Sequence, residues 1–157
     1  MKRLCFAIAL IAAAPTAALA ASYISLSVDK SALSMTDLRS PRQTGDKAET
    51  YEVLIYRAPV KAKKGMADYV INRVNFDCTR HKVSRFYSAS YSSNGDIVGA
   101  EPTPKPWSKI IPGSKEEALS TLGCHGLPPK TGIPFGDVRV GQVMAKYRAG
   151  AYDRFIH

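Results

Sequence analysis

The chain has 157 residues, of which 45% are hydrophobic, and it carries a formal net charge of +9. This length suits a single domain that buries a substantial core. No basic stripe interleaved with aromatic residues occurs, so the charge does not indicate nucleic-acid binding; it fits attraction to anionic envelope surfaces, glycans or acidic proteins, or a solvated surface that only keeps the protein soluble.

The start of the chain has the layout of a secretory signal. Lys2 and Arg3 precede an apolar stretch over residues 4–14, and small residues follow up to Ala20. The stretch is about half the roughly 20 residues that a membrane-spanning helix needs. We therefore predict cleavage after Ala20 and a protein outside the cytoplasm, periplasmic or secreted, without a transmembrane segment. Cys5 precedes the end of the apolar stretch, so we predict no lipid anchor from it; display at the cell surface stays open.

Alternating apolar and polar residues predict strands early in the remaining chain. The pattern indicates a first strand over residues 23–28 and a second over residues 50–56. Between them, residues 39–49 are polar and contain a proline and a glycine, which predicts a turn or loop. Residues 58–66 contain the same two breakers and predict a second, basic loop. This loop holds a cluster of three lysines, Lys61, Lys63 and Lys64.

Three further strands follow with short links between them. We predict them over residues 68–78, over residues 83–91 and at Ile97 and Val98, although Asn72 interrupts the apolar face of the first. The turn before the last strand contains Asn94-Gly95, a pair that supplies the positive φ angles of tight hairpins. Parallel pairing would need long crossovers, so the short links predict an antiparallel sheet.

A capped helix is predicted after a proline-rich extended segment at residues 101–107, which cannot form a central strand. Ser114 is an N-cap residue, and Glu117 three residues later completes a capping box. We expect the helix over residues 115–122, with Ala118, Leu119 and Leu122 facing the sheet.

The chain after Ala20 contains two cysteines, Cys78 and Cys124. An even number in an oxidising compartment favours a disulfide. A redox pair or a metal site lacks support, because no Cys-x-x-Cys occurs and only His125 stands beside a cysteine. The disulfide would attach the helix to the third predicted strand.

The tail, residues 125–157, begins with a stretch rich in proline and glycine, which predicts a linker. A short amphipathic helix follows, with its apolar stripe at Val140, Val143, Met144 and Tyr147. We expect the tail to be an accessory element outside the core of the sheet domain. Its stripe must dock on something, and we favour the sheet's open face over a second copy or an anionic membrane surface. The chain thus divides into a signal peptide (1–20), an α+β domain (21–124) and this extension.

No catalytic or metal-binding pattern emerges, so we predict no enzyme, no cofactor and no metal. His81, His125 and His157 lack metal-ligand spacing. Trp107 is the one tryptophan, a residue type common in binding hot spots. We favour a core position that closes the seam between helix and sheet.

Residues 23–124 resemble the surface-adhesin protein E family of bacterial exported proteins. Three features carry the resemblance: an apolar strand ending in Cys78 with basic residues after it, the hairpin over residues 94–98, and the ordered run from Trp107 through Ser114 to Cys124. The resemblance implies an antiparallel sheet with a helix packed on it, a cell-envelope location and, for the adhesin that names the family, binding of host matrix and plasma proteins.

We therefore expect an exported cell-envelope or secreted interaction protein, adhesin-like in binding extracellular or envelope proteins or an anionic glycan. The alternative is a structural or stress-related periplasmic protein without a dedicated ligand. The sequence indicates no particular oligomeric state. The candidate binding residues are Trp107, Lys61, Lys63, Lys64, Arg80 and Lys82.

Overall fold

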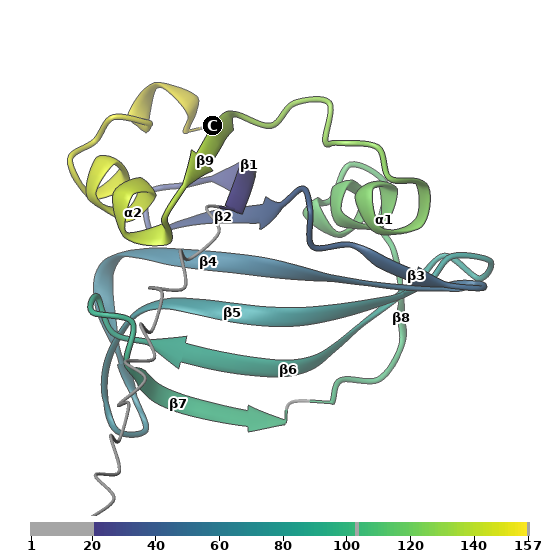
Figure 1. The fold of residues 1–157 in the computed structure, drawn as a ribbon, viewed down its shortest axis with the longest axis horizontal. Helices are drawn as coiled ribbons and strands as arrows, with labels where there is room; N and C mark the ends of the chain where they lie inside the picture. Colours follow the sequence, from purple (N-terminus) through teal and green to yellow (C-terminus); the bar gives the residue numbers. More distant parts are fainter. Residues whose placement is uncertain (1–20, 103, 157) are drawn as a thin grey trace, which may run out of the picture.

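The computed structural model describes residues 21–102 and 104–156, so the predicted signal peptide lies outside the described residues. Within this part of the chain, nine strands form one antiparallel sheet (Figure 1). The strands are β1 (Ala21–Val28), β2 (Ala32–Asp37), β3 (Arg42–Thr44), β4 (Lys47–Ala62), β5 (Gly65–Asp77), β6 (Lys82–Tyr91), β7 (Ile97–Pro102), β8 (Ser108–Lys109) and β9 (Pro134–Val138). Their order is β7-β6-β5-β4-β2-β1-β9, with β3 beside β4 and β8 beside β6.

The fold is an antiparallel sheet with helices packed on it, so the predicted α+β class is confirmed. The helices of the described residues are α1 (Lys115–His125), α2 (Val140–Arg148) and the 3-10 turn η1 (Asp153–Phe155). The five predicted strands correspond to β1, β4, β5, β6 and β7. Strand β7 ends at Pro102 and lies at the edge of the sheet, where a residue without a backbone N–H is tolerated.

The predicted basic loop over residues 58–66 is wrong. Strand β4 continues to Ala62 and β5 begins at Gly65, which leaves a two-residue turn at Lys63 and Lys64. Pro59 lies where the pairing of β4 with β5 is interrupted, between Ile55 and Val60. Its missing N–H therefore removes no hydrogen bond between these strands. The breakers that suggested a loop therefore mark a bulge and a turn within one long hairpin.

The loop predicted over residues 39–49 is also shorter than expected. Arg42 pairs with Glu49 and Thr44 with Lys47, so the segment is a small hairpin of β3 with the start of β4. Strand β2 was not predicted, and it is almost fully buried. In the β6–β7 hairpin, Gly95 alone of the predicted Asn-Gly pair has a positive φ, of 88°.

Helix α1 begins as predicted and ends later. The Ser114 hydroxyl accepts a bond of 3.3 Å from the Glu117 N–H. The Glu117 carboxylate accepts a bond of 2.8 Å from the N–H of Gly113, one residue before the capping-box position. The helix runs three residues past Leu122, and Gly126 ends it with a φ of 66°.

Each face of the sheet is covered by one helix over part of its length. Strands β4 and β5 pair without a break from Lys47 to Ile55, so alternate residues of β4 share a face. Ala48 packs with Leu119 of α1, whereas Val53 packs with Val143 of α2. The helices therefore lie on opposite faces, and Figure 1 shows them at opposite ends of β4.

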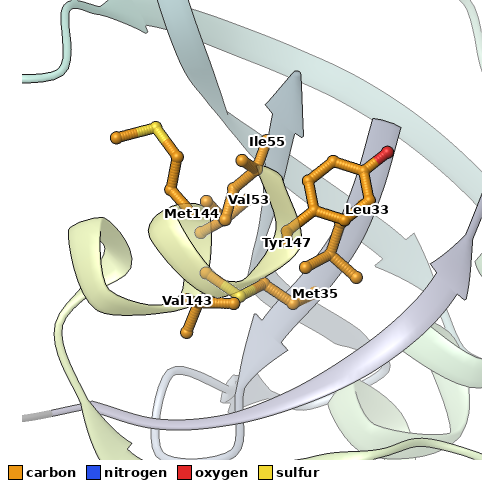
Figure 2. Packing of buried hydrophobic residues seen from close by; sticks show 7 residues of the cluster. All are labelled: Leu33, Met35, Val53, Ile55, Val143, Met144 and Tyr147. Atoms are coloured by element: carbon orange, nitrogen blue, oxygen red, sulfur yellow. The ribbon is translucent and has the colours of Figure 1, made fainter. Parts of the chain in front are cut away.

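The larger buried cluster joins α2 to β2 and β4. Figure 2 shows its residues, which are Leu33, Met35, Val53, Ile55, Val143, Met144 and Tyr147. The expected docking of the tail helix on the sheet is confirmed. The expectation that the tail stays outside the core is wrong, because three of these residues belong to α2 and β9 extends the sheet beside β1.

The predicted disulfide between Cys78 and Cys124 is present. It joins the residue after β5 to the last turn of α1. Beside it, Gly123 is buried, and a Cβ at this position would lie 3.3 Å from the Phe76 ring. The helix therefore approaches β5 closely at the point where the covalent link holds it.

Candidate functional site

An open pocket of about 460 Å³ lies at the end of the sheet that α2 leaves uncovered. Lys47 and Glu49 line it, and both share a face of β4 with Val53, which α2 covers further along. Arg73 of β5 and Trp107 complete its outline. We call this hollow the Trp107 pocket.

Trp107 forms the aromatic wall of the pocket, and 45% of its surface is exposed. The favoured core position is therefore wrong. Trp107 lies directly before β8, and the short pairing of β8 with β6 holds this part of the chain against the sheet. The Lys47 ammonium lies 5.3 Å from the centroid of the indole ring, a cation–π arrangement.

Lys47 is held in place by the buried carboxylate of Asp77, with which it forms an ion pair. The hydrogen bond from Lys47, with a second of 2.9 Å from the Arg80 N–H, lowers the pKa of Asp77. Asp77 therefore stays ionised and links the pocket to the turn that carries Arg80.

A second pair of a cation and an aromatic ring borders the pocket. The Arg73 guanidinium lies 5.7 Å from the ring centroid of Phe86, which is 48% exposed. Its Nε also donates to Glu49 at 2.6 Å, and this hydrogen bond raises the pKa of Arg73 further above its usual range. Arg42 and Lys47 also line the pocket, and because Asp77 pairs with Lys47 and Glu49 with Arg73, the three cations exceed the two carboxylates by one.

The structure separates the predicted binding residues into two groups. Trp107, Arg80 and Lys82 lie near the β5–β6 turn, since Lys82 pairs with Asp77 and with Lys109 of β8. The three lysines of residues 61–64 lie at the β4–β5 turn. The 13 residues of β5 separate the two turns, which corresponds to about 40 Å of extended strand.

Sequence reasoning missed Arg42, Lys47 and Arg73. Lys47 and Arg42 fell in a predicted loop, and Arg73 lay within the strand predicted over residues 68–78 without being singled out. The pairing of β3, β4 and β5 brings these residues together, because Arg42 lies opposite Glu49 and Glu49 lies opposite Asn75. The visible signal was the alternation of charged residues from Lys47 to Glu49, which extends the strand pattern backwards from residue 50.

A second charged cluster lies on the other face, around the carboxylate of Glu52, which is 1% exposed. It accepts bonds of 2.6 Å from Lys115 and 2.8 Å from Ser34. Arg85 lies 3.3 Å away and also pairs with Glu116 at 2.8 Å. Burial raises the pKa of Glu52, but the cations and hydrogen bonds lower it by more, so the net shift is downward.

Within residues 21–102 and 104–156, no group of three histidine, cysteine or acidic side chains could hold a metal ion. No helix in the described part of the chain is long and apolar enough to cross a membrane.

Comparison with known proteins gives one match. The model of the family described as "Surface-adhesin protein E" matches residues 23–125. No curated protein and no solved structure matches the chain. The matched segment contains β2 to β8, all but the first two residues of β1, the whole of α1 and both cysteines of the disulfide.

Proposed function

This chain belongs to the surface-adhesin protein E family, and on this premise we propose that it binds an acidic region of an extracellular or envelope protein through the Trp107 pocket. Family membership supports an adhesin-like protein that works at the cell surface or after secretion, in a non-enzymatic role. The proposal adds a site and a partner chemistry to this general function.

The exposed aromatic ring of Trp107 beside Lys47 is the observation that carries the proposal. Large aromatic residues and arginines dominate the energetics of protein interfaces. Here an exposed indole and two arginines line one hollow, and the exposed ring of Phe86 lies against one of these arginines. A partner that covers the indole would bring its carboxylates toward Arg42 and Lys47, and the excess of cations favours an acidic partner.

The experiment compares Trp107→Ala with Ile97→Ala in binding to immobilised extracellular-matrix and plasma proteins. Ile97 is a matched control because it is also an exposed apolar residue, 58% accessible, on the edge strand β7. We expect Trp107→Ala to weaken binding by more than about tenfold, as a hot-spot residue does. Ile97→Ala should stay close to the wild type. Equal binding by all three proteins would count against this pocket.

Export from the cytoplasm and cleavage of the signal peptide are also part of the proposal. The charge and apolar pattern of the first twenty residues supports export and cleavage after Ala20. N-terminal sequencing of the protein recovered outside the cytoplasm should begin at Ala21. Protease treatment of intact cells then separates display at the surface, where the protein is digested, from a periplasmic location, where it is protected.

A further inference from the structure

A polar groove lies on the face of the sheet that carries α1, beyond the part that the helix covers. Two adjoining hollows form it, one of about 460 Å³ beside the first turn of α1 and one of about 330 Å³ at the β4–β5 turn. Ser88 lines both hollows, so they adjoin at this residue. This groove is separate from the Trp107 pocket, which opens on the opposite face.

Two rows of cross-strand partners form the floor of the groove. In one row Glu52 lies opposite Asn72, then Ser88, then Glu101. The Ser88 hydroxyl donates to Asn72 at 2.6 Å, and the Asn72 amide donates to Glu52 at 3.2 Å. The floor therefore contains a hydrogen-bonded line of hydroxyl, amide and carboxylate groups from Ser88 through Asn72 to Glu52.

The second row has small or apolar side chains, which leave room above them. Its members in strand order are Leu54, Val70, Ser90 and Gly99. A Cβ added at Gly99 would lie 3.7 Å from Ser90 and 3.8 Å from the backbone nitrogen of Lys63. The groove is thus shallow at this point, and the β4–β5 turn borders it.

Cations stand at both ends of the groove. Lys105 lines the α1 end, where its N–H binds the carbonyl of Arg85, and Lys61 and Lys63 line the other end. In the described part of the chain none of these three lysines forms an ion pair, whereas Arg85 and Lys115 are neutralised by Glu52 and Glu116. The strand from Arg85 to Ser90 spans about 17 Å between the two ends.

From this arrangement we propose that the groove binds a linear anionic polysaccharide. Hydroxyl and amide groups can both donate to and accept from sugar hydroxyls, and carboxylates can accept from them. The lysines at the two ends attract acidic groups spaced along the same chain. An acidic peptide fits less well, because the floor offers few apolar pockets for side-chain anchors.

The test uses the full secreted protein and an oligomer of galacturonic acid about four sugars long, with titration calorimetry at low and physiological salt. Lys61→Gln, Lys63→Gln and Lys105→Gln are combined in one variant. The matched control combines Lys30→Gln, Lys130→Gln and Lys146→Gln, which removes the same charge from exposed positions elsewhere. We expect the groove variant to bind more than about tenfold more weakly, the control to bind within about twofold of the wild type, and salt to weaken binding.

A second variant changes shape without charge. Ser90→Tyr places a ring over the floor and should also abolish binding, with folding checked by the thermal transition. Trp107→Ala should bind the oligomer normally. The test of the groove is therefore independent of the proposed protein-binding function of the Trp107 pocket. No binding by the wild type, equal weakening in the charge-matched control, or equal binding of a hexaglutamate peptide at the same groove would each overturn the proposal.

Discussion

The Lys115 ammonium lies 2.6 Å from the Glu52 carboxylate and so joins the first turn of α1 to the middle of β4. Glu52 is almost fully buried, and Arg85 and Asn72 complete its shell of partners. A buried ion pair adds little net stability, because burying the charges costs about as much as their attraction returns. Removing the Glu52 carboxylate, however, takes away the ion-pair partner of Lys115 and leaves Arg85 with Glu116 alone. The cluster therefore fixes where α1 begins on the sheet.

Glu52→Gln should destabilise the protein by about 3 kcal/mol at pH 7, because it breaks this buried cluster. The folded-state pKa of Glu52 is lowered, so its contribution is present above the unfolded value of about 4.3 and is lost as pH falls through the folded value. The difference between variant and wild type should thus shrink well below pH 4. Urea denaturation at pH 7 and pH 3 measures it.

Glu101→Gln is the matched control for this prediction, since Glu101 ends the same cross-strand row but is exposed. It should leave the urea midpoint nearly unchanged at both pH values. A loss for Glu52→Gln that is equally large at pH 7 and pH 3 would show that the destabilisation does not come from the carboxylate charge.

The sequence could not identify Glu52 as a buried charge. In the strand predicted over residues 50–56, Tyr51, Val53 and Ile55 form the apolar face, which leaves Glu52 on the side that normally meets water. Both sides are buried because α1 arrives from more than sixty positions later in the chain. Only Asn72, which interrupts the apolar face of its own strand, signalled that this face carries a polar row.

The protein recovered after export should contain no free thiol, because Cys78 and Cys124 are joined and Cys5 lies in the predicted signal. The two cysteines are 46 residues apart, and a loop of that size is worth about 4 kcal/mol in the chain-entropy account. Thiol labelling after denaturation without reductant should give no product. Full labelling of either cysteine would contradict the prediction, and a Cys78→Ser/Cys124→Ser protein should lose stability by about that amount.

Ser114→Ala should cost about 1 kcal/mol, because it removes the side-chain acceptor of the Glu117 N–H in the first turn of α1 and leaves this N–H with the Ser114 carbonyl alone. Chemical denaturation measures the change. Ser93→Ala, at an exposed position of the β6–β7 turn, is the control and should have no comparable effect. The same midpoint for Ser114→Ala and the wild type would rule out a stabilising cap.

The capped helix and the disulfide could be predicted because their signals are local residue types with fixed chemistry. The part played by the tail could not, because it depends on pairing between the two ends of the chain. In β9, Pro134 and Gly136 look like linker residues, yet Gly136 lies opposite Tyr23 and Pro134 opposite Ile24 of β1. An edge strand tolerates both residue types, so the composition that suggested a linker is compatible with a strand.

Removing residues 126–157 should abolish the cooperative unfolding transition. The deletion takes away α2 and exposes Leu33, Met35, Val53 and Ile55, which pack against it. It also removes polar anchors: the Tyr147 hydroxyl donates to the Asp29 carbonyl at 2.7 Å, and Arg148 pairs with Asp68 at 2.7 Å. Thermal unfolding followed by circular dichroism makes the comparison with the full chain.

Two substitutions at Tyr147 test the contribution of α2 to stability without shortening the chain. Tyr147 is fully buried and its ring also lies 4.4 Å from the guanidinium of Arg57. Tyr147→Ala removes the ring and should cost about 4 kcal/mol, whereas Tyr147→Phe loses only the hydroxyl bond and should cost about 1 kcal/mol. If the shortened protein melts cooperatively near the wild-type temperature and Tyr147→Ala has no effect, the sheet is stable without α2 and the tail is an accessory after all.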